Sequence, residues 1–326
     1  MKILVTGGAG YIGSFMTKAL LDRGDEVTVF DNLERGRKEI IDFRANFIKG
    51  DLKNISDLEG LFSVSLKFDA VIHFAGLIAV GESQEFPDLY YKNNVIGSKN
   101  LFDAAINIGK VNKIIFSSSA AVYGNPIKIP IPENHPKNPT SEYGKNKLEV
   151  EGILTELRQA NSEVNFAALR YFNAAGAAID GSMGEAHIPE THIIPNIIYA
   201  MLKNEKFKLF GDDYKTKDGT CVRDYIHVLD LVSAHILALE KLENASNGYF
   251  YNVGTGNGYS NKEILEMVEK VSGKKVSFQI SPRRQGDSDE LIADATKIKN
   301  ELGFIPQYSD LETIVKTAWE WNKKQS

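Results

Sequence analysis

The stretch TGGAGYIGS, from Thr6 to Ser14, places three glycines at the spacing G-x-x-G-x-x-G. It follows an apolar run, Lys2–Thr6, that is typical of a β-strand, and it opens a segment, Tyr11–Arg23, whose apolar residues recur at helical spacing. Glycine is needed where a turn takes an unusual φ angle and where a helix must approach a strand closely. A strand, a tight glycine turn and a helix in this order predict the start of a parallel α/β sheet.

Further strand-like runs continue this alternation through the first half of the chain. They are Glu26–Phe30, Asn46–Gly50, Ala70–Phe74, Lys113–Ser118 and Val164–Arg170, and helical patterns such as Asn94–Ile106 separate them. Because repeated strand, helix, strand units imply right-handed crossovers, the expected fold class is α/β, with a doubly wound, Rossmann-like parallel sheet. Its binding site is expected at the carboxyl ends of the strands.

After Arg170 the pattern changes to loops rich in glycine and proline, with helices expected near Ile193–Leu202, Leu229–Lys241 and Asn261–Val271. We therefore expect a smaller, mixed α/β C-terminal lobe that binds substrate. The expected domains are residues 1–173 and 174–326, with a soft boundary because segments can cross back to the first lobe.

The composition is that of an ordinary soluble globular protein, with 326 residues, 43% hydrophobic and 25% charged. A net charge of -5 and the absence of a long basic run give no reason to expect a nucleic-acid partner. The sequence has no apolar stretch of bilayer length, so we expect no membrane span. The single cysteine, Cys221, indicates a reducing, cytoplasmic location and leaves no cysteine cluster for a metal, and we expect no metal site.

The glycine stretch and the end of the second strand predict a dinucleotide site. Gly7, Gly10 and Gly13 would let the backbone approach a diphosphate, and the helix that follows would point its amide hydrogens at it. Asp31, at the end of the second strand, would accept hydrogen bonds from both ribose hydroxyls of NAD and would repel the 2'-phosphate of NADP. Asp51, after the third strand, is either a contact to the adenine amino group or a turn residue.

YGKNK, from Tyr143 to Lys147, places a phenol and an ammonium four residues apart, on one face of a helix. Together with the glycine stretch, this pair resembles the extended short-chain dehydrogenase/reductase superfamily. The resemblance implies that Tyr143 is a base, since a nearby cation can stabilise a phenolate whose ordinary pKa is about 10. It marks Ser119 for a hydroxyl that bonds the substrate oxygen, although Ser117 and Ser118 are adjacent alternatives.

A closer resemblance, to the UDP-glucose 4-epimerase family, runs nearly end to end. The motifs that carry it are TGGAGYIGS, HFAGLIAVGES (His73 to Ser83), NNVIG, FSSSAAVYG (Phe116 to Gly124), YGKNKLEVE, LRYFNAAGA (Leu169 to Ala177), DGTCVRDYIHVLDL (Asp218 to Leu231), YNVGTGNGYS and PRRQGD (Pro282 to Asp287).

The resemblance implies a set of site residues. For NAD it adds Tyr11, Ile12, Asn32, Leu52, Phe74, Ala75, Gly76, Asn93, Ser119, Tyr143, Lys147 and Phe172, of which Ile12 and Phe74 suit core packing equally well. For a UDP-hexose it implies Ser119, Tyr143, Asn173, His192, Phe210, Arg223, Arg284 and Asp287, with the arginines on the diphosphate and Phe210 beside the uracil.

The function that the resemblance implies is reversible epimerisation of UDP-glucose and UDP-galactose at C4, through a 4-keto intermediate, with tightly bound NAD and in a homodimer. Four positions depart from the better-known bacterial pattern. Ile78 stands in place of a lysine, Ala121 in place of a frequent threonine, and His192 in place of an asparagine. Leu291 is intermediate in size at a position thought to admit or exclude N-acetylated sugars, so an epimerase of UDP-N-acetylglucosamine is an alternative.

Two other functions remain alternatives. One is a different extended sugar-nucleotide enzyme, such as a dehydratase or reductase. Ala120 and Ala121 disfavour it because they supply no acid to expel water. The other is a non-catalytic NAD sensor or scaffold, which would have no need of Ser119, Tyr143 and Lys147.

Overall fold

The computed structural model describes residues 1–63, 67–244, 247–284 and 287–325. The chain forms two compact units. The first consists of Met1–Gly124, Lys137–Arg170 and Ala234–Tyr251, and the second of Asn125–Pro136, Tyr171–Ser233 and Asn252–Ser326. Each unit thus takes one segment from the opposite half of the chain.

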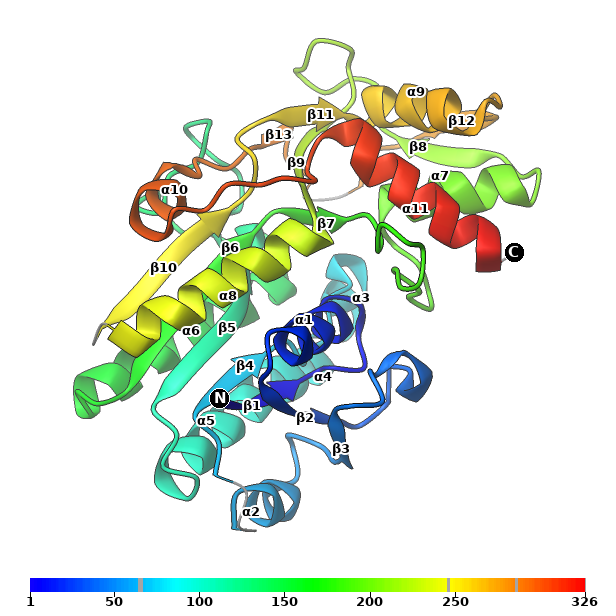
Figure 1. Cartoon of the computed structure of the whole chain (residues 1–326). Coiled ribbons are helices and arrows are strands. Elements are labelled where there is room, and N and C mark those ends of the chain that lie inside the picture. Colours follow the sequence, from blue (N-terminus) through cyan, green and yellow to red (C-terminus); the bar gives the residue numbers. More distant parts are fainter. Residues whose placement is uncertain (64–66, 245–246, 285–286, 326) are drawn as a thin grey trace. The chain divides into compact units, whose positions relative to one another are not determined.

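The first unit is built on a seven-stranded sheet (Figure 1). Its strands are β1 (Lys2–Thr6), β2 (Glu26–Asp31), β3 (Asn46–Lys49), β4 (Ala70–His73), β5 (Lys113–Ser119), β6 (Asn165–Tyr171) and β10 (Gly248–Val253). The order is β10-β6-β5-β4-β1-β2-β3, and pairing is parallel from β5 to β3. From β1 the strands are added toward one edge as β2 and β3, and from β4 onward they are added toward the other edge. The position between β1 and β4 is therefore the switch point at which doubly wound folds bind ligands. The expected fold class is confirmed; β10 is a strand that the sequence patterns did not indicate.

Helices cover both faces of this sheet (Figure 1). The layer made of α2 (Ile55–Ser63), α5 (Gly97–Asn107) and α6 (Glu142–Ala160) packs on a core that includes Leu58, Phe102 and Leu154. On the other face lie α1 (Tyr11–Asp22) and the part of α8 (Val228–Asn244) that belongs to this unit. The short helices α3 (Val80–Glu85) and α4 (Pro87–Tyr90) precede a π-helical turn, η2 (Tyr91–Ile96). The helix expected from Asn94 therefore becomes regular only at Gly97.

Helix α6 has an unusually polar buried face. Ser141 caps its N-terminus by accepting a hydrogen bond from the amide of Gly144. Asn146, Lys147 and Glu151 are all buried on this helix. Glu151 forms an ion pair of 2.6 Å with Arg170 of β6, which is also buried. The helix is therefore positioned by specific polar contacts as well as by apolar packing.

The second unit combines helices with parallel and antiparallel strands. Strand β9 (Val222–His227) pairs in parallel with β7 (Asn173–Ala175) and β13 (Glu290–Leu291), and antiparallel with β11 (Gly258–Ser260). A separate parallel pair joins β8 (Phe207–Phe210) to β12 (Phe278–Ser281). The helices are α7 (Ile193–Leu202), α9 (Asn261–Ser272), α10 (Thr296–Leu302) and α11 (Leu311–Gln325). Within the described residues, no helix combines the length and the apolar character that crossing a membrane requires.

Candidate functional site

The glycine turn between β1 and α1 leaves no room for side chains. Gly7 has a φ of 73°, and a Cβ atom there would lie 2.5 Å from the amide nitrogen of Ala75. A Cβ on Gly13 would overlap the carbonyl oxygen of Gly7. Tyr11 is buried, whereas Ile12, next to it, is only partly buried. Gly7 and Gly13 therefore allow the turn to pack closely against the start of α1 and the loop after β4.

Asp31 is held at the end of β2 by two backbone amides. Its Oδ2 accepts a hydrogen bond from Ala9 at 3.1 Å, and its Oδ1 accepts one from Leu33 at 2.8 Å. Burial raises the pKa of this carboxyl group, although the two hydrogen bonds act in the opposite direction. The side chain is thus tied to the glycine turn, which places two predicted cofactor contacts side by side.

The loops after β2 and β3 are joined by a side-chain contact. The side-chain amide of Asn32 donates a hydrogen bond to the carboxylate of Asp51 at 3.2 Å. Asp51 also accepts from the backbone amide of Lys53 at 2.8 Å, so it stabilises its own turn. Leu52, which follows it, is buried.

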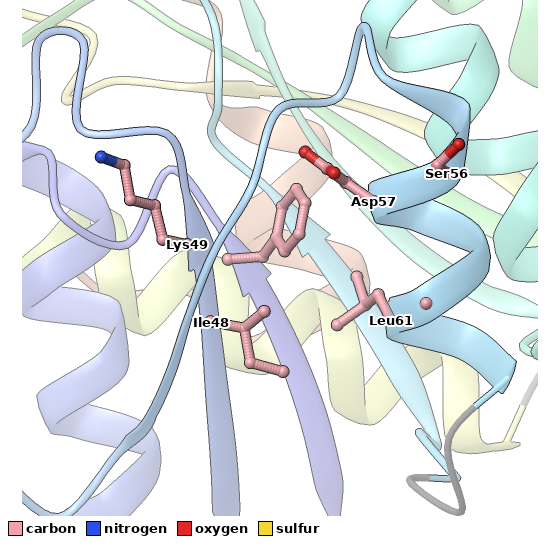
Figure 2. A pocket seen from close by; sticks show the side chains of 7 residues that line it. Ile48, Lys49, Ser56, Asp57 and Leu61 are labelled. Carbon is pink, nitrogen blue, oxygen red and sulfur yellow. The ribbon is translucent and has the colours of Figure 1, made fainter.

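A cavity of about 260 Å³ opens between β3 and α2 (Figure 2). Its lining residues are Phe30, Ile48, Lys49, Ser56, Asp57, Gly60 and Leu61. None of them is a predicted site residue. Asp57 accepts a hydrogen bond from the amide of Asp51 at 2.9 Å, so the cavity borders the Asp51 turn.

The loop after β4 lies against Lys147. A Cβ on Gly76 would be 3.9 Å from the Lys147 ammonium nitrogen and 3.2 Å from the Asn94 side-chain oxygen. Asn94 exchanges two hydrogen bonds with the backbone of Leu77, at 2.8 and 2.9 Å, and so fixes this loop. Phe74, Ala75 and the predicted cofactor contact Asn93 are partly buried.

Tyr143 and Lys147 lie one turn apart on α6. The Nζ atom of Lys147 is 5.7 Å from the centre of the Tyr143 ring. Burial lowers the pKa of Lys147 to about 8, and the charge of Glu151 only partly offsets this. The Tyr143 ring packs with Leu77 and Tyr90, and Ala121 borders this cluster.

The three serines at the end of β5 have different environments. Ser117 and Ser118 are buried, and the hydroxyl of Ser118 donates to Glu151 at 2.7 Å. Ser119 is only partly buried, and its hydroxyl accepts from the amide of Ala121 at 3.2 Å. Ser119 is therefore the serine of this run whose side chain is open to a ligand.

In the second unit, β9 gathers several predicted substrate contacts. The side-chain amide of Asn173 donates a hydrogen bond of 3.0 Å to the backbone carbonyl of Asp224, the residue that follows Arg223. Arg223 lies 3.4 Å from Asp287 and pairs in register with Leu291.

The remaining predicted residues of the second unit form two further groups. The Arg284 guanidinium stacks 4.3 Å from the centre of the Phe210 ring, which suits a contact to a base and a phosphate. His192 instead lies among Glu185, His187 and Glu190. Phe172 is buried just before β7.

Three further residues of the first unit, Ser83, Asn94 and Glu151, position the site, although none of them was a predicted site residue. Ser83, which is buried, accepts a hydrogen bond from the backbone amide of Tyr143 at 3.2 Å. Asn94 holds the Gly76 loop, and Glu151 lies one turn beyond Lys147. A signal existed for all three, because Ser83, Asn94 and Glu151 fall within the motifs HFAGLIAVGES, NNVIG and YGKNKLEVE respectively.

Comparison with known proteins gives a consistent result. Residues 3–254 match the family described as NAD dependent epimerase/dehydratase. The UDP-glucose 4-epimerase of Lactobacillus helveticus is 46% identical over 324 residues, which cover 99% of this chain and 97% of that protein.

Two solved structures extend the similarity to the fold. The UDP-glucose 4-epimerase of Brucella ovis, in complex with NAD, is 42% identical with a TM-score of 0.94, and 98% of each chain is covered. The UDP-Glc/GlcNAc 4-epimerase of Campylobacter jejuni is 42% identical with a TM-score of 0.85, and 99% of each chain is covered. With the glycine turn, Asp31 and the Tyr143–Lys147 pair in place, this chain belongs to the NAD dependent epimerase/dehydratase family.

Proposed function

We propose that this protein catalyses the reversible epimerisation of UDP-glucose and UDP-galactose at C4, with NAD as its bound cofactor. The observation that carries the proposal is the Tyr143–Lys147 pair, with a buried ammonium beside the phenol and next to the Gly76 loop. The names of its full-length relatives support the same reaction.

The first unit fits NAD. A Cβ atom at Gly7 or Gly13 would collide with the protein's own backbone, so the glycines allow the tight turn that precedes α1. The amide groups at the start of this helix would bind the diphosphate. Asp31 would take the ribose, and Asp51 with Asn32 would lie near the adenine. Further contacts to the cofactor are assigned to Gly10, Tyr11, Ile12, Leu52, Phe74, Ala75, Gly76, Asn93, Ser119, Tyr143, Lys147 and Phe172. When bound, NAD would take up a hydride from C4 of the sugar and return it.

Tyr143 acts on the proton of the C4 hydroxyl. As a phenolate it would remove this proton, and as a phenol it would return it to the C4 oxygen when the hydride comes back to C4. Lys147 stabilises the phenolate by its charge. The hydroxyl of Ser119 would hold the same sugar oxygen by a hydrogen bond. Ala120 and Ala121 add no acid, which agrees with a reaction that expels no water.

The second unit would recognise the UDP part of the substrate. Arg223 and Arg284 present forks of donors suited to a diphosphate, with Asn173 and Asp287 beside Arg223. Phe210, which already stacks on Arg284, would lie against the uracil. His192 would contact the sugar.

A second candidate substrate pair is UDP-N-acetylglucosamine and UDP-N-acetylgalactosamine. The Campylobacter jejuni relative is named for both glucose and N-acetylglucosamine substrates. Leu291 lies next to Arg223 in the β13–β9 pairing and is only partly buried, so its size bears directly on this choice.

We also propose that the protein is a cytoplasmic homodimer. The buried single cysteine, Cys221, agrees with a reducing compartment. The dimer rests on the family resemblance, and light scattering after size-exclusion chromatography would measure it.

The decisive experiment incubates the purified protein with UDP-galactose, and in parallel with UDP-N-acetylgalactosamine, without added NAD. NMR should show conversion of UDP-galactose into an equilibrium mixture with UDP-glucose. Tyr143→Phe should lower the rate by between about 10² and 10⁴-fold. Tyr91→Phe, which changes an exposed phenol bonded to Glu149, should not. Stoichiometric accumulation of NADH would instead indicate a net redox enzyme, and full activity of Tyr143→Phe would rule out the assigned base.

A further inference from the structure

Four potential metal ligands meet in the loop that precedes α7. Glu185, His187, Glu190 and His192 each offer one ligand atom, and these atoms all lie within 4.8 Å of one another. Nδ1 of His187 is 2.9 Å from Oε1 of Glu185, and Nδ1 of His192 is 2.5 Å from the same oxygen. Nδ1 of His192 is also 3.3 Å from Oε1 of Glu190.

The two carboxylates of this cluster are buried. The side chains of Glu185 and Glu190 are 4% and 6% exposed. In the part of the chain that the structure describes, the ion pairs of both are with His187 and His192 alone. Burying two carboxylates without a permanent cation is costly, because the charged form loses its hydration. A divalent ion would supply the missing positive charge.

Two atoms of the cluster lack hydrogen bonds. Oε2 of Glu190 is buried and unpartnered, while Oε1 accepts from the backbone amides of Thr191 and His192. Nδ1 of His192, despite its short distance to Glu185, makes no hydrogen bond of acceptable angle. Nδ1 of His187, by contrast, does share a hydrogen bond with Oε1 of Glu185 at 2.9 Å. The unpartnered atoms of Glu190 and His192 are the ones that a bound ion would satisfy.

The distances agree with a tetrahedral ion. Zinc binds histidine nitrogen and carboxylate oxygen at about 2.0–2.2 Å, which separates neighbouring ligand atoms by about 3.3 Å. The observed separations of 2.5, 2.9 and 3.3 Å need only a small outward adjustment. Two nitrogens and two carboxylates suit zinc and related first-row ions better than magnesium or calcium, which prefer oxygen.

Two residues outside the cluster, Trp321 and Asn196, hold this loop by hydrogen bonds to its backbone. The indole of Trp321 donates to the carbonyl oxygen of Glu185 at 2.8 Å. The side-chain amide of Asn196 donates to the carbonyls of Glu190 and His192, at 3.3 and 2.9 Å. Such contacts fix the backbone that carries the ligands.

We propose that Glu185, His187, Glu190 and His192 form a binding site for one divalent transition-metal ion, with Zn²⁺ as the best fit. The ion would reach the site through the histidines, whose side chains are 24% and 39% exposed. Bound there, it would neutralise both carboxylates and fix the loop before α7. His192 is also the residue assigned to the sugar, so the metal site touches the proposed function at one ligand. We assign the metal no role in the epimerase reaction, and metal binding is measured in the absence of substrate.

Calorimetry on the metal-stripped full-length protein tests this directly. Titration with Zn²⁺ should show one ion per chain, and Co²⁺ should give the intense visible absorption of a four-coordinate site. Zn²⁺ should also raise the melting temperature, because it binds the folded state. The substitutions His187→Gln and Glu190→Gln should each weaken binding by about 100-fold or more.

Two further measurements of Zn²⁺ binding can refute the proposal: one on a matched control variant and one on the unaltered protein. Glu312→Gln, in an exposed ion pair of the same unit, should bind Zn²⁺ as the unaltered protein does. Absence of a one-to-one site in the unaltered protein would overturn the proposal, and the cluster would then be a set of charged hydrogen-bonding groups. Unchanged affinity in both His187→Gln and Glu190→Gln would overturn it as well.

Discussion

The ammonium of Lys147 donates a hydrogen bond of 2.7 Å to the carbonyl oxygen of Ser117, which connects the second turn of α6 to the end of β5. The same nitrogen lies 4.9 Å from the centre of the Phe116 ring. Lys147 is therefore held in place by contacts within the protein, and two predictions depend on it.

Removing this charge should slow turnover strongly without unfolding the protein. In Lys147→Met, the phenolate of Tyr143 loses its supporting cation, so kcat should fall by between about 10² and 10⁴-fold. The melting temperature should change little, because a buried cation is itself costly to the fold. The control is Lys145→Met, an exposed lysine on the same helix that pairs with Glu142. Activity of Lys147→Met close to that of Lys145→Met would contradict the assigned role.

The lowered pKa of Lys147, about 8, should appear in the pH dependence of the reaction. Below this pH the ammonium is charged and can support the phenolate. As the pH rises through this value the charge is lost, so kcat should decline on the alkaline side. A pH profile of UDP-galactose conversion measures this, and a kcat that stays flat well above pH 8 would disagree.

The glycine turn offers a paired test of steric fit. Gly13→Ala places a methyl group against the carbonyl of Gly7, so the turn must distort and NAD should no longer co-purify. Gly152→Ala, in the interior of α6 with nothing within 4 Å of the new methyl, should stabilise the protein by up to about 1 kcal/mol. The NAD content, read from absorbance after denaturation, should separate the two variants. Normal NAD content in Gly13→Ala would refute the assignment of this turn.

The buried Glu151–Arg170 pair should matter far more than an exposed pair. Arg170→Met leaves a buried carboxylate without its partner and should cost about 3–5 kcal/mol in urea unfolding. Asp103→Asn, which breaks an exposed pair with Lys99 on α5, should cost about 1 kcal/mol or less. The double variant Glu151→Leu with Arg170→Met should recover much of the loss. Equal costs for the buried and the exposed pair would show that Glu151 does not hold α6.

Much of the first unit was predictable because its signals are local. The spacing of Gly7, Gly10 and Gly13, the acid at Asp31 and the Tyr143–Lys147 interval each reflect geometry within one turn or helix. The hydrogen bonds between Asn94 and the backbone of Leu77 were not predictable, because they join a helical turn to a loop 17 positions earlier in the chain. The π-helical turn before Gly97 was missed for a related reason: apolar periodicity does not distinguish it from a regular helix.

The second unit was harder to predict because its site is assembled from distant segments. Arg223 and Asp287 are 64 residues apart in the chain, and Arg284 meets Phe210 only in the folded structure. The sequence indicated each of these residues separately, but it did not indicate which of them contact one another. The Glu185–His192 cluster has no cysteine, so the expectation of no metal, which considered cysteine clusters, did not weigh it.

The strand β10 has a consequence for the synthesis of this protein. Its partner β6 ends at residue 171, but β10 begins only at Gly248, so the edge of β6 is uncovered while the intervening residues are translated. At about 5–20 residues per second, this interval is on the order of ten seconds. During that time the nascent chain presents an open strand edge, which favours association with other chains. Ribosome-bound chains stalled shortly before residue 248 should therefore bind chaperones more strongly than chains released after completion.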